Sequence, residues 1–370
     1  MITFKGNSKP SVGIELELQI LDKATNRLVS YADQIVSAIG DPQIKRELFQ
    51  STLEIVSSPS TDLNEIEDEL KLLLKKAIKV GDKFGVDLVM AGTNPLTSWE
   101  EQKVTAIPRY LKMIEKIKWP ARIMMIFGLH VHVGVESANA AIYVCNNILA
   151  YLPQLLALSA SSPFWGKTDT GLASCRTMIF ESLPTAGLPD RFKDWHDYEH
   201  FVSSMITAGS IDTYRDIWWD VRPHPDFGTV EIRIFDAVPG LKESMSLAAL
   251  TQMLVHHLAQ QYHASITGNH EAPYWLIKEN KWRASRYGID ADILVNGGQS
   301  TAPISSQIEE MLRMVMPSAK FLGTIGYIDS IREIIKKGPS YKRQLALYNG
   351  KRRDFNVILE SLKSELKNSL

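Results

Sequence analysis

The chain has 370 residues, of which 45% are hydrophobic and 22% are charged, and its formal net charge is −1. This near-neutral balance gives no global field that would attract nucleic acid or an anionic membrane. The two cysteines, Cys145 and Cys175, are too few for a disulfide framework and favour a reducing compartment. The N-terminus lacks an apolar signal core, and no apolar run approaches the roughly 20 residues that span a bilayer. We therefore expect a cytoplasmic protein.

Strand-like and helix-like stretches share the first half of the chain. Strand patterns cover 12–21, 44–57, 86–93 and 122–135, and helix patterns cover 61–84 and 137–158. A stretch rich in Ser, Pro, Gly and Thr at 161–192 predicts a long functional loop. Because helices do not regularly separate the strands, the pattern favours an α+β fold over a doubly wound sheet.

After the long loop, a helix pattern at 194–209 leads to two strand patterns at 216–225 and 227–238. The remainder is mostly helical. No internal repeat and no low-complexity linker interrupts the chain. We therefore predict a single domain over residues 1–370, with a mainly helical part at about 242–370.

Three of the predicted strands each carry two polar side chains at positions i and i+2. Side chains alternate along a strand, so each pair projects from one face while apolar neighbours cover the other. The pairs are Glu15 with Glu17, His130 with His132, and Glu231 with Arg233. If these strands share a sheet, their polar faces form a floor whose buried charges need a metal or a polyphosphate as partner.

Glu54 repeats this pattern in STLEIVSSP, and Glu47 stands seven residues upstream, within reach of the same site if a turn intervenes. Glutamate oxygens suit Mg²⁺ or Mn²⁺. The alternatives are exposed glutamates on an edge strand, or a surface ion pair for Glu47. The H-x-H pair of His130 and His132 is also a zinc pattern, so it does not identify the metal.

The long loop holds candidate ligand-binding residues. Gly166 and Gly171 would let backbone amides approach a ligand, and Lys167 between them is a candidate cofactor-binding residue. No Walker-type spacing is present, so the loop is no P-loop. We interpret Cys175 as a small buried thiol and not as a nucleophile, because no activating partner is identifiable.

Taken together and in order, these motifs resemble the type 2 glutamate–cysteine ligase family, and most of all its YbdK-like carboxylate–amine ligases. The resemblance covers roughly residues 12–240. It rests on GIELELQ, STLEIVSSP, GLHVHVG, the segment from SSPFWG to TAGLP, and GTVEIRIFD. Each motif is weak alone, and the ordered set is specific.

The resemblance implies a glutamine-synthetase-like catalytic fold, in which a curved antiparallel sheet backed by helices forms the floor of a funnel. It implies binding of ATP and of Mg²⁺, with Mn²⁺ as an alternative. The implied metal-binding residues are Glu15, Glu17, Glu54, His130, Glu231 and Glu47. Arg233 matches a phosphate-contacting arginine, His132 is placed against nucleotide or substrate, and Arg176 contacts the substrate carboxylate.

The implied activity is an ATP-dependent ligase that forms an amide through an acyl phosphate, with glutamate and cysteine as the family's substrates. Losing one preorganised phosphate contact in such a site costs on the order of 10² to 10³ in rate. The alternative is a zinc or binuclear metallohydrolase built on His130-x-His132 and acidic ligands. A homodimer is the expected assembly. No residue identifies the acid, the amine or the group that accepts the amine's proton.

Overall fold

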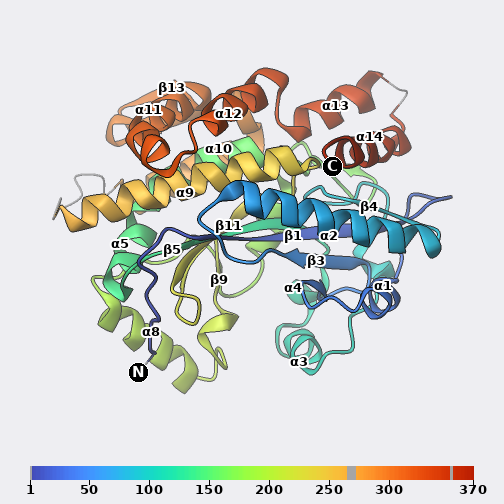
Figure 1. Ribbon diagram of the computed structural model, residues 1–370, viewed down its shortest axis with the longest axis horizontal. Coiled ribbons are helices and arrows are strands. Elements are labelled where there is room, and N and C mark those ends of the chain that lie inside the picture. The colour runs from blue at the N-terminus through green and yellow to red at the C-terminus, as the bar shows by residue number, and fades with distance from the viewer. Residues whose placement is uncertain (1, 265–271, 351–352) are drawn as a thin grey trace.

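An antiparallel sheet of seven strands forms the centre of the molecule (Figure 1). The computed structural model describes residues 2–264, 272–350 and 353–370. The strand order is β10-β11-β5-β1-β3-β2, and β4 pairs with the far end of β1. The strands are β1 (Val12–Asp22), β2 (Ile44–Arg46), β3 (Thr52–Val56), β4 (Val86–Val89), β5 (Gly128–Gly134), β10 (Val221–His224) and β11 (Thr229–Asp236).

Helices cover one face of this sheet. In Figure 1, α2 and α9 lie along the sheet, and the C-terminal helices lie beyond them. Helices α11 and α12 pack on α9, and α10 packs on α6. These helices are α2 (Leu63–Lys83), α5 (Ala138–Ile148), α6 (Leu152–Ser159), α9 (Leu241–His263), α10 (Tyr274–Tyr287), α11 (Ile304–Leu322), α12 (Gly326–Lys337), α13 (Ser340–Gly350) and α14 (Phe355–Asn368).

Shorter elements surround the opposite face, where α3 and α8 lie in Figure 1. The helices here are α1 (Ala32–Ile39), α3 (Pro108–Ile117), α4 (Trp119–Arg122), α7 (Cys175–Phe180) and α8 (Trp195–Thr207). Three two-stranded pairs complete the fold: β6 (Phe164–Trp165) with β7 (Thr168–Asp169), β8 (Ala186–Gly187) with β9 (Trp218–Trp219), and β12 (Asp292–Val295) with β13 (Ser300–Pro303).

The alternation of β1 explains which face of the sheet is covered. Val12, Ile14, Leu16 and Leu18 are at most 1% exposed and belong to the main hydrophobic core, which extends into the C-terminal helices. Burial of such side chains contributes roughly 25 cal/mol for each Å² of apolar surface removed from water. The alternate positions of the strand face the other way, so the polar residues remain on the face that the long helices leave open.

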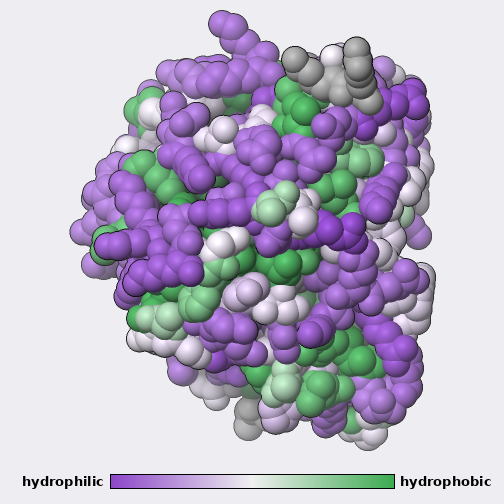
Figure 2. Space-filling view, turned by 90° about the vertical axis from the view of Figure 1, so that its right-hand side faces the viewer, coloured by the Kyte–Doolittle hydropathy of each residue, from purple (hydrophilic) through white to green (hydrophobic). Residues whose placement is uncertain are grey.

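One segment meets the length and hydropathy of a membrane span, contrary to our expectation that no apolar run approaches that length. It is Ala138–Ser159, which comprises α5 and α6. In its most apolar window 72% of the residues are buried inside the protein, as in the core helix of a globular fold. Figure 2 shows one outer face, on which hydrophilic residues predominate and hydrophobic residues lie among them.

Candidate active site

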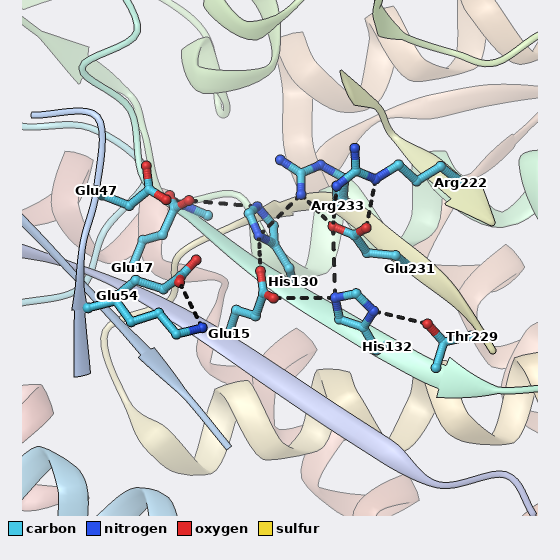
Figure 3. A network of polar contacts seen from close by, with 12 residues as sticks. Glu15, Glu17, Glu47, Glu54, His130, His132, Arg222, Thr229, Glu231 and Arg233 are labelled. Atoms are coloured by element: carbon cyan, nitrogen blue, oxygen red, sulfur yellow. Dashed lines mark hydrogen bonds and ion pairs between the residues drawn. The ribbon is translucent and has the colours of Figure 1, made fainter. Parts of the chain in front are cut away.

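The register of the sheet brings the predicted polar residues side by side. On neighbouring strands, Glu15 lies opposite His130, Glu17 opposite Glu54, and Glu231 opposite His132. Directly opposed residues in an antiparallel pair have Cβ atoms about 4.5–5.5 Å apart, so these side chains must interact. The three polar pairs of β1, β5 and β11 therefore form one continuous polar floor (Figure 3).

A cavity of about 450 Å³ opens over this floor. Five carboxylates and seven basic side chains line it, which suits both cations and phosphate groups. The predicted site residues among its walls are Glu15, Glu17, Glu47, Glu54, His130, His132, Arg176, Glu231 and Arg233. Lys167 is not among the lining residues; it is exposed in the turn between β6 and β7.

The two histidines of β5 have different partners. The Nδ1 atom of His130 lies 3.0 Å from a carboxylate oxygen of Glu15. The Nδ1 atom of His132 instead lies 3.1 Å from the Thr229 hydroxyl. The buried Nε2 atom of His132 has no hydrogen-bond partner among the described residues, and it faces Glu15 at 3.4 Å and Glu231 at 3.9 Å. A proton on Nδ1 would leave the Nε2 lone pair free to ligate a cation.

Glu231 is 1% exposed and is held between two arginines. The Arg222 Nε atom donates to Glu231 at 2.7 Å, and Arg233 forms a second ion pair with the same carboxylate. Burial alone would raise the pKa of Glu231, but the two guanidinium groups hold it well below its usual range. Burial would likewise raise the pKa of Glu15, but its contacts with His130 and His132 hold it well below its usual range.

Glu17, Glu47 and Glu54 form the other end of the floor, as Figure 3 shows. Burial raises the pKa of Glu17 to about 7, with repulsion from Glu47 as the second cause. Burial and the neighbouring carboxylates also raise the pKa of Glu54 well above its usual value, and burial raises the pKa of Glu47. These carboxylates lack enough positive charge nearby.

The partners of this second group are mostly neutral. The Gly128 amide donates to Glu17 at 2.5 Å, and the Tyr110 hydroxyl donates to Glu47 at 3.1 Å. The nearest basic side chain to Glu54 is Lys45, at 3.8 Å. Hydrogen bonds from neutral groups orient a carboxylate but do not cancel its charge.

Arg176 projects from the N-terminal turn of α7 and is only 3% exposed. It donates from Nη2 to the backbone carbonyl of Arg233 at 3.3 Å, while its Nε atom has no partner among the described residues. A Cβ atom at Gly128 would collide with the Arg176 guanidinium, so this close approach requires glycine there. The guanidinium is thus fixed beneath the cavity with spare donor capacity.

The residues present fit a divalent cation. Ligand atoms of Glu15, His132 and Glu231 all lie within 4.8 Å of one another. The unpartnered His132 Nε2 atom is among them, and the set of oxygens with one nitrogen suits Mg²⁺ or Mn²⁺. This group contains His132, whereas the family resemblance points to His130 as the ligand, and that assignment stays a prediction.

Several wall residues could not be predicted from the sequence. Tyr110 and Arg109 come from α3 and Trp218 comes from β9, and no motif in the sequence marked any of the three as part of a site. Both cysteines are buried thiols, which confirms the expectation for Cys175. Burial raises the pKa of Cys175 to about 12, so this thiol is protonated and unreactive at neutral pH.

Solved structures share this fold. The chain superimposes on the glutamate–cysteine ligase of Francisella tularensis, a complex with AMP, with a TM-score of 0.71 and 12% identity, covering 99% of this chain and 94% of the other. The bifunctional glutathione synthetase of Pasteurella multocida gives a TM-score of 0.69 at 12% identity, over 98% of this chain and 53% of the other. The predicted α+β architecture around an antiparallel sheet is confirmed, and it is the fold of the Francisella tularensis glutamate–cysteine ligase.

The fold and its relatives define an ATP-dependent carboxylate–amine ligase. A relative from Thermobifida fusca named "Putative glutamate--cysteine ligase 2" is 38% identical over 94% of this chain and 88% of its own length. A relative from Frankia casuarinae is also 38% identical, over 99% of this chain and 97% of its own. The profile of glutamate-cysteine ligase family 2 matches residues 11–360, and the chain belongs to this family. The metallohydrolase alternative receives no support from these relatives.

Proposed function

We propose that this ligase joins the carboxylate of glutamate to the amine of cysteine, giving γ-glutamylcysteine, ADP and phosphate. The observation that carries the proposal is the polar floor itself, with buried carboxylates at one end and arginines at the other. A carboxylate is a poor electrophile, so transfer of the γ-phosphoryl group first makes it an acyl phosphate. The family membership supports these substrates, and their identity is the finer part of the proposal.

We infer that Mg²⁺, with Mn²⁺ as an alternative, binds the floor during the reaction. The residues that would hold it are Glu15, Glu17, Glu47, Glu54, Glu231, and His132 or His130. When bound, divalent cations neutralise the repulsion between the substrate carboxylate and the phosphate groups. The carboxylates therefore need no role as general acids or bases.

The arginines supply the remaining charge stabilisation. Arg233 is fixed by Glu231 and faces the cavity beside His130, where it would bind oxygens of the transferring phosphoryl group. Arg176, with unused donors and full burial, would orient the substrate carboxylate. The amine then attacks the acyl carbon, a C–N bond forms, the C–O bond to phosphate breaks, and the amine gives up a proton.

The test is a pairwise screen. Purified protein with ATP and Mg²⁺ is offered acids and amines singly and in pairs, ADP release is measured, and products are identified by mass. We expect ADP release that needs the acid and a product that contains both substrates. Metal-dependent ATP hydrolysis that ignores both substrates would contradict a ligase. Formation of an amide without glutamate or cysteine would overturn only the substrate assignment.

We further propose that the protein acts in the cytoplasm and as a homodimer. The two free, buried cysteines support a reducing compartment. Sedimentation of the purified chain tests the dimer, and a single species at the mass of 41.6 kDa would exclude it.

A further inference from the structure

A second cavity adjoins the active-site cavity. It measures about 620 Å³, and we call it the side pocket. Its walls come from α3, from the turn after α7 and from the segment between α8 and β9. The two cavities share the wall residues Arg109, Met113, Arg215 and Trp218. The two cavities therefore meet at these four residues, and the side chains of Arg109, Met113, Arg215 and Trp218 define the boundary that an extended ligand would span.

The side pocket has an apolar lining that the fold covers only in part. Met113 and Ile117 lie on its α3 wall, and no residue of α3 is buried, although the helix is amphipathic. Ile211, which is 2% exposed, and Trp218 face them from the other wall. Helices such as α2 bury their apolar residues against the core. The apolar residues of α3 are only partly buried against the main core, and Met113 and Ile117 also border this pocket, so an apolar ligand would complete their burial.

The charges around the pocket favour an anionic ligand. Four basic and two acidic residues line it. Lys112 and Lys116 lie 2.7 and 3.9 Å from Asp212, which joins α3 to the opposite wall through exposed ion pairs. Arg215 pairs with Asp226, outside the pocket, at 2.6 Å. Basic charge in excess of acidic charge remains.

Arg109 lies at the boundary between the two cavities and contributes to the excess of positive charge there. In the part of the chain that the structure describes, its side chain makes no hydrogen bond and no ion pair. A guanidinium with all five donors available is a strong partner for a carboxylate. An amino acid whose side chain fills the side pocket could place its carboxylate on Arg109 and its amine in the active-site cavity.

From this geometry we propose that the side pocket binds the side chain of the amine substrate. The preferred amine is then an amino acid with a large apolar side chain. The inference rests on the proposed ligase reaction and changes its amine. The acid must meet the phosphate among the buried carboxylates before the amine attacks, which leaves the part of the cavity beside the side pocket for the amine. Cysteine would leave most of a 620 Å³ pocket empty.

The test compares amines that need the pocket with one that does not. Hydroxylamine traps an acyl phosphate as a hydroxamate and has no side chain that could occupy the side pocket. The acid that gives most hydroxamate is then paired with cysteine, phenylalanine or phenethylamine. We expect kcat/KM for phenylalanine to exceed that for cysteine at least about tenfold, the scale on which an apolar pocket discriminates.

Two variants, Ser210→Trp and Arg109→Gln, test whether the preference for phenylalanine depends on the side pocket. Ser210 is exposed and lines only the side pocket, so Ser210→Trp fills it. We expect KM for phenylalanine to rise at least about tenfold, with hydroxamate formation and KM for ATP within about twofold of the parent. Ser203→Trp, on the exposed side of α8 and outside both cavities, is the matched control. Arg109→Gln should raise KM for phenylalanine and spare phenethylamine, which has no carboxylate.

The outcomes separate the two proposals. Hydroxamate formation combined with unchanged kinetics of Ser210→Trp overturns the side-pocket inference and leaves the ligase intact. A raised KM for ATP in Ser210→Trp would assign the pocket to the nucleotide and overturn the inference as well. Failure to form hydroxamate with any acid would remove the proposed function, and the side pocket's role with it.

Discussion

Two groups of carboxylates on the same sheet face differ in how their charge is balanced. Glu15 and Glu231 have histidines and arginines as partners, and their pKa values lie well below the usual range. Glu17 and Glu54 are equally enclosed, yet their pKa values are raised, because burial and mutual repulsion outweigh distant cations. Basic side chains of the chain itself balance the first group, which can also offer ligands to a cation, whereas the second group needs positive charge from outside the chain.

This difference separates two tasks that the sequence alone presents as one pattern. We call the part of the floor around Glu15 and Glu231 the balanced end. Its contacts hold Arg233 and His132 in position. The unbalanced end, around Glu17 and Glu54, carries negative charge that a proton or a ligand cation must neutralise. Neutralising a glutamate should therefore have opposite effects on stability at the two ends, while it lowers activity at both.

The largest effect is expected for Glu231→Gln. The change leaves Arg222 and Arg233 buried without their common partner, and breaking such a pair costs about 3 to 5 kcal/mol of folding free energy. ADP formation should fall by about 10² to 10³ as well. Urea unfolding and an ADP-release assay measure both. Glu333→Gln, at an exposed surface ion pair, is the matched control. Full turnover at limiting Mg²⁺ would refute the assignment.

Glu15→Gln should keep most of the stability and lose the activity. Glu15 contacts His130 and His132 but no arginine, so no buried cation loses its sole partner. We expect ADP formation to fall by about 10² to 10³, with a higher Mg²⁺ requirement. Titration of activity with Mg²⁺ checks this. A variant with parental activity at every Mg²⁺ concentration would show that the balanced end binds no metal.

The pH dependence of stability should reveal the unbalanced end. Glutamate titrates near 4.5 when unperturbed, whereas the pKa of Glu17 is about 7 in the folded protein. Between these values the folded state binds more protons, so metal-free stability falls as pH rises, by at most about 1.4 kcal/mol per pH unit for each group. Glu15 and Glu231 act oppositely, with stability lost only as pH falls below about 4.5. Urea unfolding with a chelator across this range measures the slope.

Added Mg²⁺ is the control for that slope. Cations that bind the ionised carboxylates should restore stability more at pH 8 than at about pH 5, because binding then competes with fewer protons. His130 and His224, whose pKa values burial lowers to about 4, contribute a slope of the opposite sign, so the comparison is made with Glu17→Gln. A slope that this variant leaves unchanged would show that Glu17 is already balanced by the fold.

Glu54→Gln should give the smallest change, and in the opposite direction to Glu231→Gln. Removal of one buried, repelled charge should raise metal-free stability by about 1 kcal/mol near neutral pH. Its partner Lys45 is half-exposed and loses little. Thermal unfolding with and without Mg²⁺ tests this, since the variant should gain less from Mg²⁺ than the parent. A destabilised metal-free variant would contradict the comparison.

Residues that lie on strands were predicted well, and residues that reach the site from elsewhere were not. The i, i+2 pairs on β1, β5 and β11 fixed which side chains share a face, because side-chain alternation is a local property of a strand. Tyr110 and Arg109 reach the cavity only because α3 folds back over it, which no local pattern indicates. Lys167 shows the converse, since a glycine-flanked lysine in a suggestive loop lies outside the cavity.

The sequence by itself determined the α+β class, the polar face of each strand and, through its ordered motifs, the ligase family. The tertiary structure decided which polar residues oppose one another. Strand order and register place Glu15 beside His130 and Glu231 beside His132, and these are set by how the apolar faces pack against α2 and α9. The balance of charge depends on those distances, and so does the division of the floor into carboxylates with basic partners and carboxylates without them.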